Sequence, residues 1–157
     1  MLGSITRALA QSGLSADRLE LEITESLLIE RYIEVIPLVQ QLKKLGISIV
    51  LDDFGTGYSS LSYLAMLPFD KIKIEKTFAQ NLTNGAECAA IFSAVRTLGN
   101  ALHMQTIAEG VETEEQLRLV RAAGINFVQG YLLGGPYSAS DLNLTCFTTE
   151  TSAEKAA

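Results

Sequence analysis

The chain has 157 residues, which fits one domain, and its 48% apolar and 19% charged residues form a normal globular mixture with ample material for a core. A net charge of −6 argues against a large basic surface, so we expect no DNA binding. If the ligand is a phosphate ester, a metal ion must offset its repulsion from an acidic site. The sequence shows no signal peptide and no membrane span, so we expect a soluble protein. Cys88 and Cys146 form no disulfide or metal pattern, which fits the reducing cytoplasm.

Five short strand-like runs alternate with helix-like segments. Residues 19–24 alternate apolar and polar side chains with a period of two, which predicts a strand. Further strands are expected at 47–51, 71–74, 104–109 and 127–133, and helices at 27–44, 59–66, 86–102 and 113–123. The last of these helices opens with the spacing of a capping box, Thr113 to Gln116. A final helix is expected to begin near Ser138 or Ser140, and the tail at 148–157 is small and polar enough to fray.

Strict alternation of strands and helices predicts a parallel sheet, because parallel strands need long crossover connections. A doubly wound open sheet and a (β/α)8 barrel of the TIM type both fit. The length favours the open sheet, since a full barrel typically needs about 250 residues. Polar residues favour the barrel, because every predicted strand carries one at or near its C-terminal end: Glu22, Asp52 with Asp53, Lys73, Glu109 and Gln129. A barrel gathers such ends into one ring, so the expected fold is α/β, a partial barrel of about five parallel strands.

Four carboxylates lie at three of these strand ends. Brought together without cations they would repel one another, and an all-oxygen ligand set suits Mg²⁺ or Mn²⁺. The adjacent pair Asp52-Asp53 has a second interpretation, because acids before a glycine turn often cap a helix or stabilise the turn. Glu22 is harder to explain without a cation, since strands of a parallel sheet are usually buried on both faces.

The other polar candidates each allow two interpretations. Lys73 belongs either to a solvated or ion-paired strand face or to a site where it orients water and neutralises phosphate charge. Glu112 fits the N-terminal turn of the next helix better than a direct catalytic role. Gln129 is either a satisfied core amide or a ligand contact. His103, the single histidine, lies at the opposite strand ends and is expected to be structural, which excludes a zinc hydrolase.

Five strings of residues stand out in this order: Glu22-Ile23-Thr24-Glu25, Asp52-Asp53-Phe54-Gly55-Thr56-Gly57, Lys73-Ile74-Glu75, Ala108-Glu109-Gly110-Val111-Glu112-Thr113 and Gln129-Gly130-Tyr131. Together they resemble the signatures of EAL-type cyclic di-GMP phosphodiesterase domains. The strings are similar to that family's Glu-x-Thr-Glu motif, its Asp-Asp pair with the following mobile loop, its Lys-Ile-Asp motif and its last two signatures. The resemblance covers about residues 14–136.

The resemblance implies hydrolysis of cyclic di-GMP to linear pGpG at a two-metal site that holds Mg²⁺ or Mn²⁺. It implies that Glu22 and Asp52 bind the first ion and that Asp52 and Asp53 bind the second. The implied partners are cyclic di-GMP and a second subunit or a partner protein.

The resemblance also implies roles for residues outside this ligand set. Lys73 would hold the attacking water, Glu109 would serve as a metal-site or general-base carboxylate, and Gln129 would contact the water or the substrate. Glu25 would anchor the loop that follows Asp53 and couple metal occupancy to the dimer contact. Glu112 would have at most a supporting role.

The sequence departs from the family in two ways, and the first bears on activity more than on fold. The Glu-Ala-Leu motif, a metal-binding asparagine and a substrate-binding arginine are absent from these 157 residues, and Glu75 replaces the usual aspartate. We therefore expect an N-terminally truncated EAL domain at 1–147 with a flexible tail at 148–157. Two functions remain open: a phosphodiesterase, or a catalytically inactive module that binds a partner protein or cyclic di-GMP.

Overall fold

The structure is a computed structural model that describes residues 1–55, 61–82 and 86–138. Its five parallel strands follow one another across a single sheet: β1 (Glu20–Thr24), β2 (Ser48–Phe54), β3 (Lys71–Ile74), β4 (Gln105–Ala108) and β5 (Phe127–Val128). The helices are α1 (Leu2–Ser12), the short 3-10 helix η1 (Ala16–Arg18), α2 (Glu25–Glu30), α3 (Tyr32–Lys44), α4 (Leu61–Met66), α5 (Lys76–Gln80), α6 (Ala86–Ala101) and α7 (Glu114–Ala122). The expected α/β fold with five parallel strands is confirmed.

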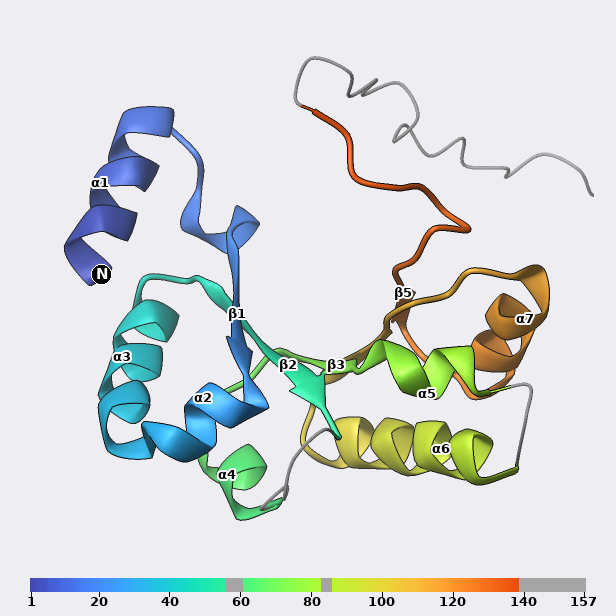
Figure 1. Cartoon of the computed structure of the whole chain (residues 1–157). Coiled ribbons are helices and arrows are strands. Elements are labelled where there is room, and N and C mark those ends of the chain that lie inside the picture. Colours follow the sequence, from blue (N-terminus) through green and yellow to red (C-terminus); the bar gives the residue numbers. More distant parts are fainter. Residues whose placement is uncertain (56–60, 83–85, 139–157) are drawn as a thin grey trace, which may run out of the picture.

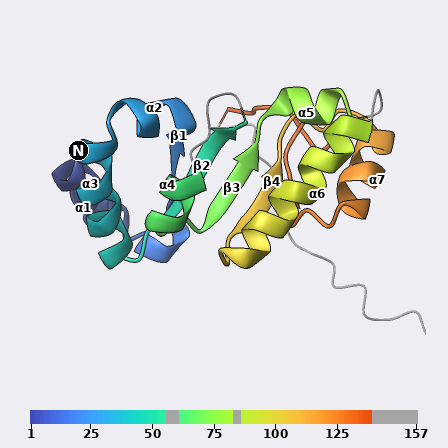
Figure 2. The same cartoon turned by 90° about the horizontal axis from the view of Figure 1, so that it is seen from below.

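The sheet is curved, and the helices that connect its strands lie outside the curve (Figures 1 and 2). Each strand pairs with the next one along the chain, from β1 to β5. A doubly wound sheet would instead reverse its strand order and place helices on both faces. Because no described helix covers the inner face in Figure 1, the arrangement is that of a section of a barrel.

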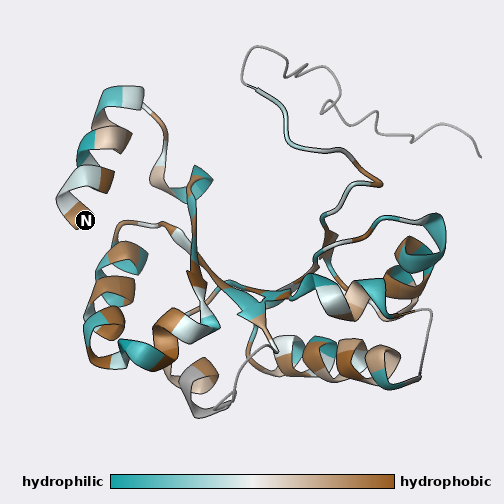
Figure 3. Cartoon of the chain, viewed as in Figure 1, coloured by the Kyte–Doolittle hydropathy of each residue, from teal (hydrophilic) through white to brown (hydrophobic). Residues whose placement is uncertain are grey.

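The hydrophobic core fills the space between the outer face of the sheet and the helices. Ile49 and Leu51 of β2 and Ile72 and Ile74 of β3 are almost fully buried there, at alternate positions of their strands. The helices present apolar residues toward them, and Figure 3 shows hydrophobic and hydrophilic segments alternating along α3 and α6. One apolar face and one solvent face per helix is the pattern that burial against a sheet requires.

The inner face of the sheet carries a row of charged side chains. Glu20 of β1 forms an ion pair with Lys71 of β3 across the intervening strand, and the Lys71 ammonium lies 4.9 Å from the centre of the Phe127 ring. The next inward residues along the same strands are Glu22 and Lys73, which also pair. Charged side chains that bridge three strands therefore line the inside of the curve.

The predicted helix at 27–44 is wrong as a single element, because it is divided into α2 and α3. Arg31 separates them with φ −125° and ψ 35°, which lies outside the helical region. The apolar spacing gives no sign of this break, since the buried residues Leu28 and Val35 are seven positions apart and would share one face of a continuous helix.

Other differences concern short elements. The sequence interpretation missed α1, although Leu2, Ile5 and Leu9 have helical spacing and pack against the core. It also missed α5, which Glu75 caps by accepting a hydrogen bond from the Thr77 amide at 2.9 Å. The residue that departs from the family's Lys-Ile-Asp motif therefore has a structural role as a helix cap.

The fifth strand is shorter than predicted. It was expected over 127–133, but β5 has two residues, because the chain turns back at Gly130, whose carbonyl accepts from the Leu133 amide at 3.0 Å. The capping box of α7 is confirmed, with Thr113 and Gln116 bonded to each other's backbone amides. The predicted last helix lies outside the described residues. None of the described helices is long and apolar enough to cross a membrane.

Candidate metal centre

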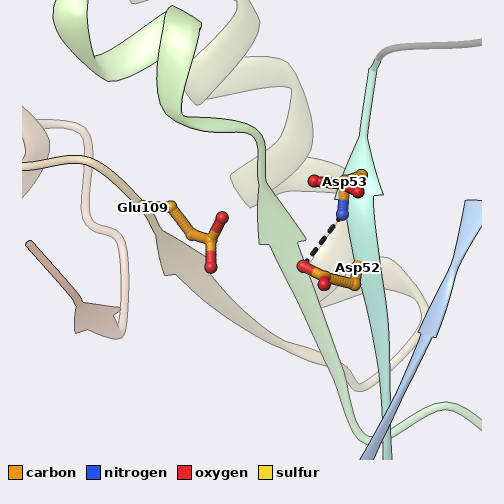
Figure 4. Close-up of side chains that lie close together, drawn as sticks. All are labelled: Asp52, Asp53 and Glu109. Carbon is orange, nitrogen blue, oxygen red and sulfur yellow. Dashed lines mark hydrogen bonds between the residues drawn. The ribbon is translucent and has the colours of Figure 1, made fainter. Parts of the chain in front are cut away.

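Three carboxylates meet at the C-terminal ends of β2 and β4. Asp52 and Asp53 follow the buried part of β2, and Glu109 follows directly after β4, so the parallel sheet brings all three to the same edge. One oxygen from each lies within 4.8 Å of the other two, and all three residues are half-buried (Figure 4). An all-oxygen set of this charge and spacing fits a hard divalent cation such as Mg²⁺ or Mn²⁺.

A bulge in β2 places the two adjacent aspartates on one side. Neighbouring residues of a regular strand point to opposite faces. Here the register with β3 shifts between Leu51 and Phe54, and Asp53 has a positive φ of 56°. The Asp53 amide donates to Asp52 Oδ1 at 3.0 Å, and Figure 4 shows both carboxylates directed toward Glu109. Bulges of this kind re-aim side chains beside functional sites.

Lys73 of β3 lies between these carboxylates. Its Nζ is 2.5 Å from Glu109 Oε1, 2.9 Å from Glu22 Oε1 and 3.4 Å from Asp52 Oδ1, and its side chain is 5% exposed. Burial by itself lowers the pKa of the lysine, but hydrogen bonds to Glu109 and Glu22 and the charges of Glu109 and Asp52 raise that pKa above its ordinary value. The ammonium therefore stays charged at neutral pH.

Glu22 differs from the sequence interpretation in its surroundings. It was expected to be buried within a strand covered on both faces, but its side chain is 49% exposed. The reason is that β1 is at one edge of the described sheet and the inner face has no helical cover. Its carboxylate contacts Lys73 and lies outside the group of three, so its assignment as a metal ligand stays a prediction.

Glu25 connects the first helix after β1 to the backbone beyond the aspartate pair. It is the first residue of α2, is 4% exposed, and its Oε2 accepts a hydrogen bond from the Gly55 amide at 3.1 Å. This hydrogen bond fits a residue that anchors the loop after Asp53. The predicted loop follows Asp53, and its residues 56–60 lie outside the described residues, so this role also stays a prediction.

A pocket of about 450 Å³ adjoins the acidic group and shares Glu109 with it. Gln129 and Glu112, both candidates from the sequence, line it, and Glu112 Oε1 accepts a hydrogen bond from Gln80 Nε2 at 3.2 Å. Lys76, Gln80 and Tyr131 also line the pocket, although the sequence interpretation gave the first two no role. No sequence signal marks Lys76 and Gln80, because α5 was not predicted.

Gly130 shapes this pocket through a close backbone contact. A Cβ at this position would lie 2.1 Å from the Val111 carbonyl oxygen and 2.4 Å from the Val111 nitrogen. Absence of a side chain lets Val111 donate to the Gln129 carbonyl at 3.1 Å, which joins the turn after β4 to the end of β5. His103 lies far from this region, exposed between α6 and β4, where the sequence interpretation placed it.

A section of a parallel α/β barrel with an acidic, metal-compatible group at its strand ends is the class that this fold and site define. The EAL domain model matches residues 1–136. The chain belongs to the EAL domain family.

Several known proteins and solved structures are similar to this chain. The chain is 41% identical over 136 residues to the cyclic di-GMP phosphodiesterase NbdA of Pseudomonas aeruginosa, covering 87% of this chain and 17% of that protein. The structure titled PaMucR phosphodiesterase in complex with c-di-GMP is 41% identical, with a TM-score of 0.84, covering 88% of this chain and 56% of that one. The manganese and cyclic di-GMP complex of Klebsiella pneumoniae BlrP1 is 31% identical, with a TM-score of 0.81, covering 86% and 34%.

These matches confirm the expected architecture, since EAL domains are TIM-barrel-like. The chain spans about a fifth of the length of the curated relatives it matches and about half of the PaMucR phosphodiesterase structure.

Proposed function

We propose that this chain carries the acidic metal centre of a cyclic di-GMP phosphodiesterase, which hydrolyses cyclic di-GMP to linear pGpG with Mg²⁺ or Mn²⁺. One observation carries the proposal: Asp52, Asp53 and Glu109 converge within 4.8 Å of one another on a family scaffold. The manganese and cyclic di-GMP complex of BlrP1, to which the chain is similar, supports the choice of metal and substrate.

Asp52, Asp53 and Glu109 are the residues that would hold the ions, with Glu22 completing the set as the family resemblance implies. A divalent ion bound there supplies positive charge that stabilises the phosphodiester oxygens and activates water. The bulge in β2 contributes by presenting two carboxylates from consecutive residues, which a regular strand does not allow.

The contacts of Lys73 support a role in holding water or stabilising charge. Its ammonium is buried, fixed by three carboxylates and charged at neutral pH. A cation in this place orients a water molecule by hydrogen bonding and offsets charge that develops on the phosphoryl group. Gln129 and Tyr131 in the adjoining pocket would contact the nucleotide that extends away from the scissile bond.

A second candidate function is a module that binds cyclic di-GMP or a partner protein without cleaving it. The observation that favours it is the lack of a Glu-Ala-Leu segment in these 157 residues, since the family resemblance assigns that glutamate to the metal. We also propose what the family resemblance implies for partners and location: a homodimer or an assembly with a partner protein, in the cytoplasm.

The test is turnover by the purified 157-residue chain. Incubation with cyclic di-GMP and Mn²⁺ should yield pGpG, and Asp52→Asn should abolish the product while leaving the circular dichroism spectrum unchanged. Glu20→Gln is the matched control, because Glu20 is an acidic residue of the same inner face that pairs with Lys71 and lies outside the acidic group. A folded chain that binds cyclic di-GMP but releases no pGpG would favour the binding module.

A further inference from the structure

Lys73 occupies the place that the proposed function gives to divalent ions. Its ammonium contacts Glu22, Asp52 and Glu109, and each of these three carboxylates is one to which the proposed function assigns metal binding. We propose that Lys73 is an internal counter-ion of the acidic centre, which holds the three strand ends together without metal and competes with the divalent ion for their oxygens. This inference rests on the proposed function and adds a regulatory property, the metal concentration at which the site fills.

The short contact between Lys73 and Glu109 favours competition between the ammonium and a divalent ion. Metal–oxygen distances for Mg²⁺ are about 2.0–2.1 Å, and Glu109 Oε1 already lies 2.5 Å from the Lys73 ammonium. An ion bound to the same oxygen would therefore be an immediate neighbour of the ammonium, with like charge. Because the lysine side chain is 5% exposed, little solvent is present to screen that repulsion. Metal binding therefore weakens the contacts between the ammonium and these carboxylates, although the ammonium can stay beside the ion.

The same contacts explain how the centre remains stable without metal. Glu22, Asp52 and Glu109 come from β1, β2 and the end of β4, and they converge from different strands on one cation. Without that cation the carboxylates would repel and each would lose its ion pair. Only the ammonium is buried and the carboxylates are partly exposed, so removing Lys73 leaves their charges uncompensated and is destabilising. Lys73 thus replaces the metal as the centre's positive charge.

Lys71 provides a matched control within the same strand. It lies two residues before Lys73 on the same inward face, and it pairs with Glu20, which is outside the acidic group. Lys71→Met and Lys73→Met each remove one inward ammonium and one or more ion pairs. Only Lys73→Met removes a cation that contacts the proposed metal ligands.

The experiment titrates MnCl₂ into the full chain and both variants by calorimetry, with thermal unfolding measured in chelator and in excess Mn²⁺. For Lys73→Met we expect a Mn²⁺ dissociation constant about tenfold lower than wild type, because the ion no longer competes with the ammonium for the same carboxylate oxygens. Its midpoint of unfolding should fall in chelator and recover in Mn²⁺. Lys71→Met should leave the Mn²⁺ dissociation constant unchanged.

If Lys73→Met fails to fold in chelator, the double variant with Glu109→Gln decides the question. We expect the double variant to refold without metal, because one of the repelling charges is gone. A double variant that stays unfolded would show that Lys73 acts through packing, and this would overturn the inference. Equal or weaker Mn²⁺ binding by Lys73→Met would also overturn it, while leaving the proposed function standing. Failure of every form to bind Mn²⁺ would contradict both, and Mn²⁺ binding without pGpG release would contradict the phosphodiesterase alone.

Discussion

The carboxylate of Glu25 accepts a hydrogen bond from the backbone amide of Gly55 at 3.1 Å, two residues after Asp53. Because Glu25 begins α2 and is buried, this bond fixes the chain just beyond the aspartate pair to the helix that follows β1. The backbone just beyond the aspartate pair is therefore fixed by a residue from a different strand-helix unit.

We expect Glu25→Gln to lower the free energy of unfolding by about 1–3 kcal/mol, since a charge-assisted hydrogen bond to a buried group is replaced by a weaker neutral one. It should also weaken Mn²⁺ binding, because Asp53 loses a fixed neighbour. Urea denaturation and calorimetry would measure the two effects. Glu30→Gln, an exposed glutamate at the end of the same helix, serves as the control and should change neither. An unchanged Mn²⁺ affinity in Glu25→Gln would argue against an anchoring role.

Asp53 has a positive φ, so two substitutions can test its charge and its backbone conformation independently. Aspartate and asparagine tolerate left-handed backbone geometry, whereas a β-branched residue does not. Asp53→Asn should therefore keep the backbone geometry of the bulge and weaken Mn²⁺ binding at least about tenfold by removing a charged ligand, equivalent to about 1.4 kcal/mol. Asp53→Val should in addition lower the free energy of unfolding by about 1–3 kcal/mol through backbone strain.

Calorimetric titration and denaturation of the two variants side by side would check these effects. Equal stability of the valine and asparagine variants would show that the bulge in β2 adapts to either side chain, and would contradict the strain.

Gly130 should not accept a side chain. Gly130→Ala would place a Cβ 2.1 Å from the Val111 carbonyl oxygen, so the turn after β4 and the end of β5 must separate. We expect a loss of about 1–3 kcal/mol in the free energy of unfolding, the usual range for overpacking, together with loss of cyclic di-GMP binding. Gly3→Ala is the control, since a Cβ there meets nothing within 4 Å, and this exposed helical position should be neutral or slightly stabilised. A stable Gly130→Ala variant would contradict the close approach.

Tyr131 lines the pocket beside Glu109 and is 73% exposed, so its ring is accessible to a ligand in that pocket. Tyr131→Ala should weaken cyclic di-GMP binding by about tenfold, within the 1–3 kcal/mol that one stacked base contributes. Mn²⁺ binding should not change, because Tyr131 is not a metal ligand. Tyr137, which is similarly exposed but does not line the pocket, provides the control variant Tyr137→Ala. Equal affinities of the two variants for cyclic di-GMP would remove the pocket from the proposed binding site.

Periodicity predicts regular elements better than it predicts breaks and short segments. The strand Lys71–Ile74 was predicted at its observed bounds, and the capping box at Thr113 marks the start of α7. The break at Arg31 was not predictable, because Leu28 and Val35 keep the spacing of one continuous helix. The two-residue length of β5 was also missed, since the apolar run continues past the turn at Gly130.

The sequence by itself determined the parallel α/β architecture and the edge at which the acidic residues gather. Strand-helix alternation makes all strands run in one direction, so residues at their C-terminal ends must meet. Only the tertiary structure decided how those residues meet. The bulge that aims Asp52 and Asp53 to one side, the exposure of Glu22 and the three carboxylates around Lys73 depend on backbone dihedrals and on register between strands distant in sequence, and side-chain periodicity within one strand carries no information about either.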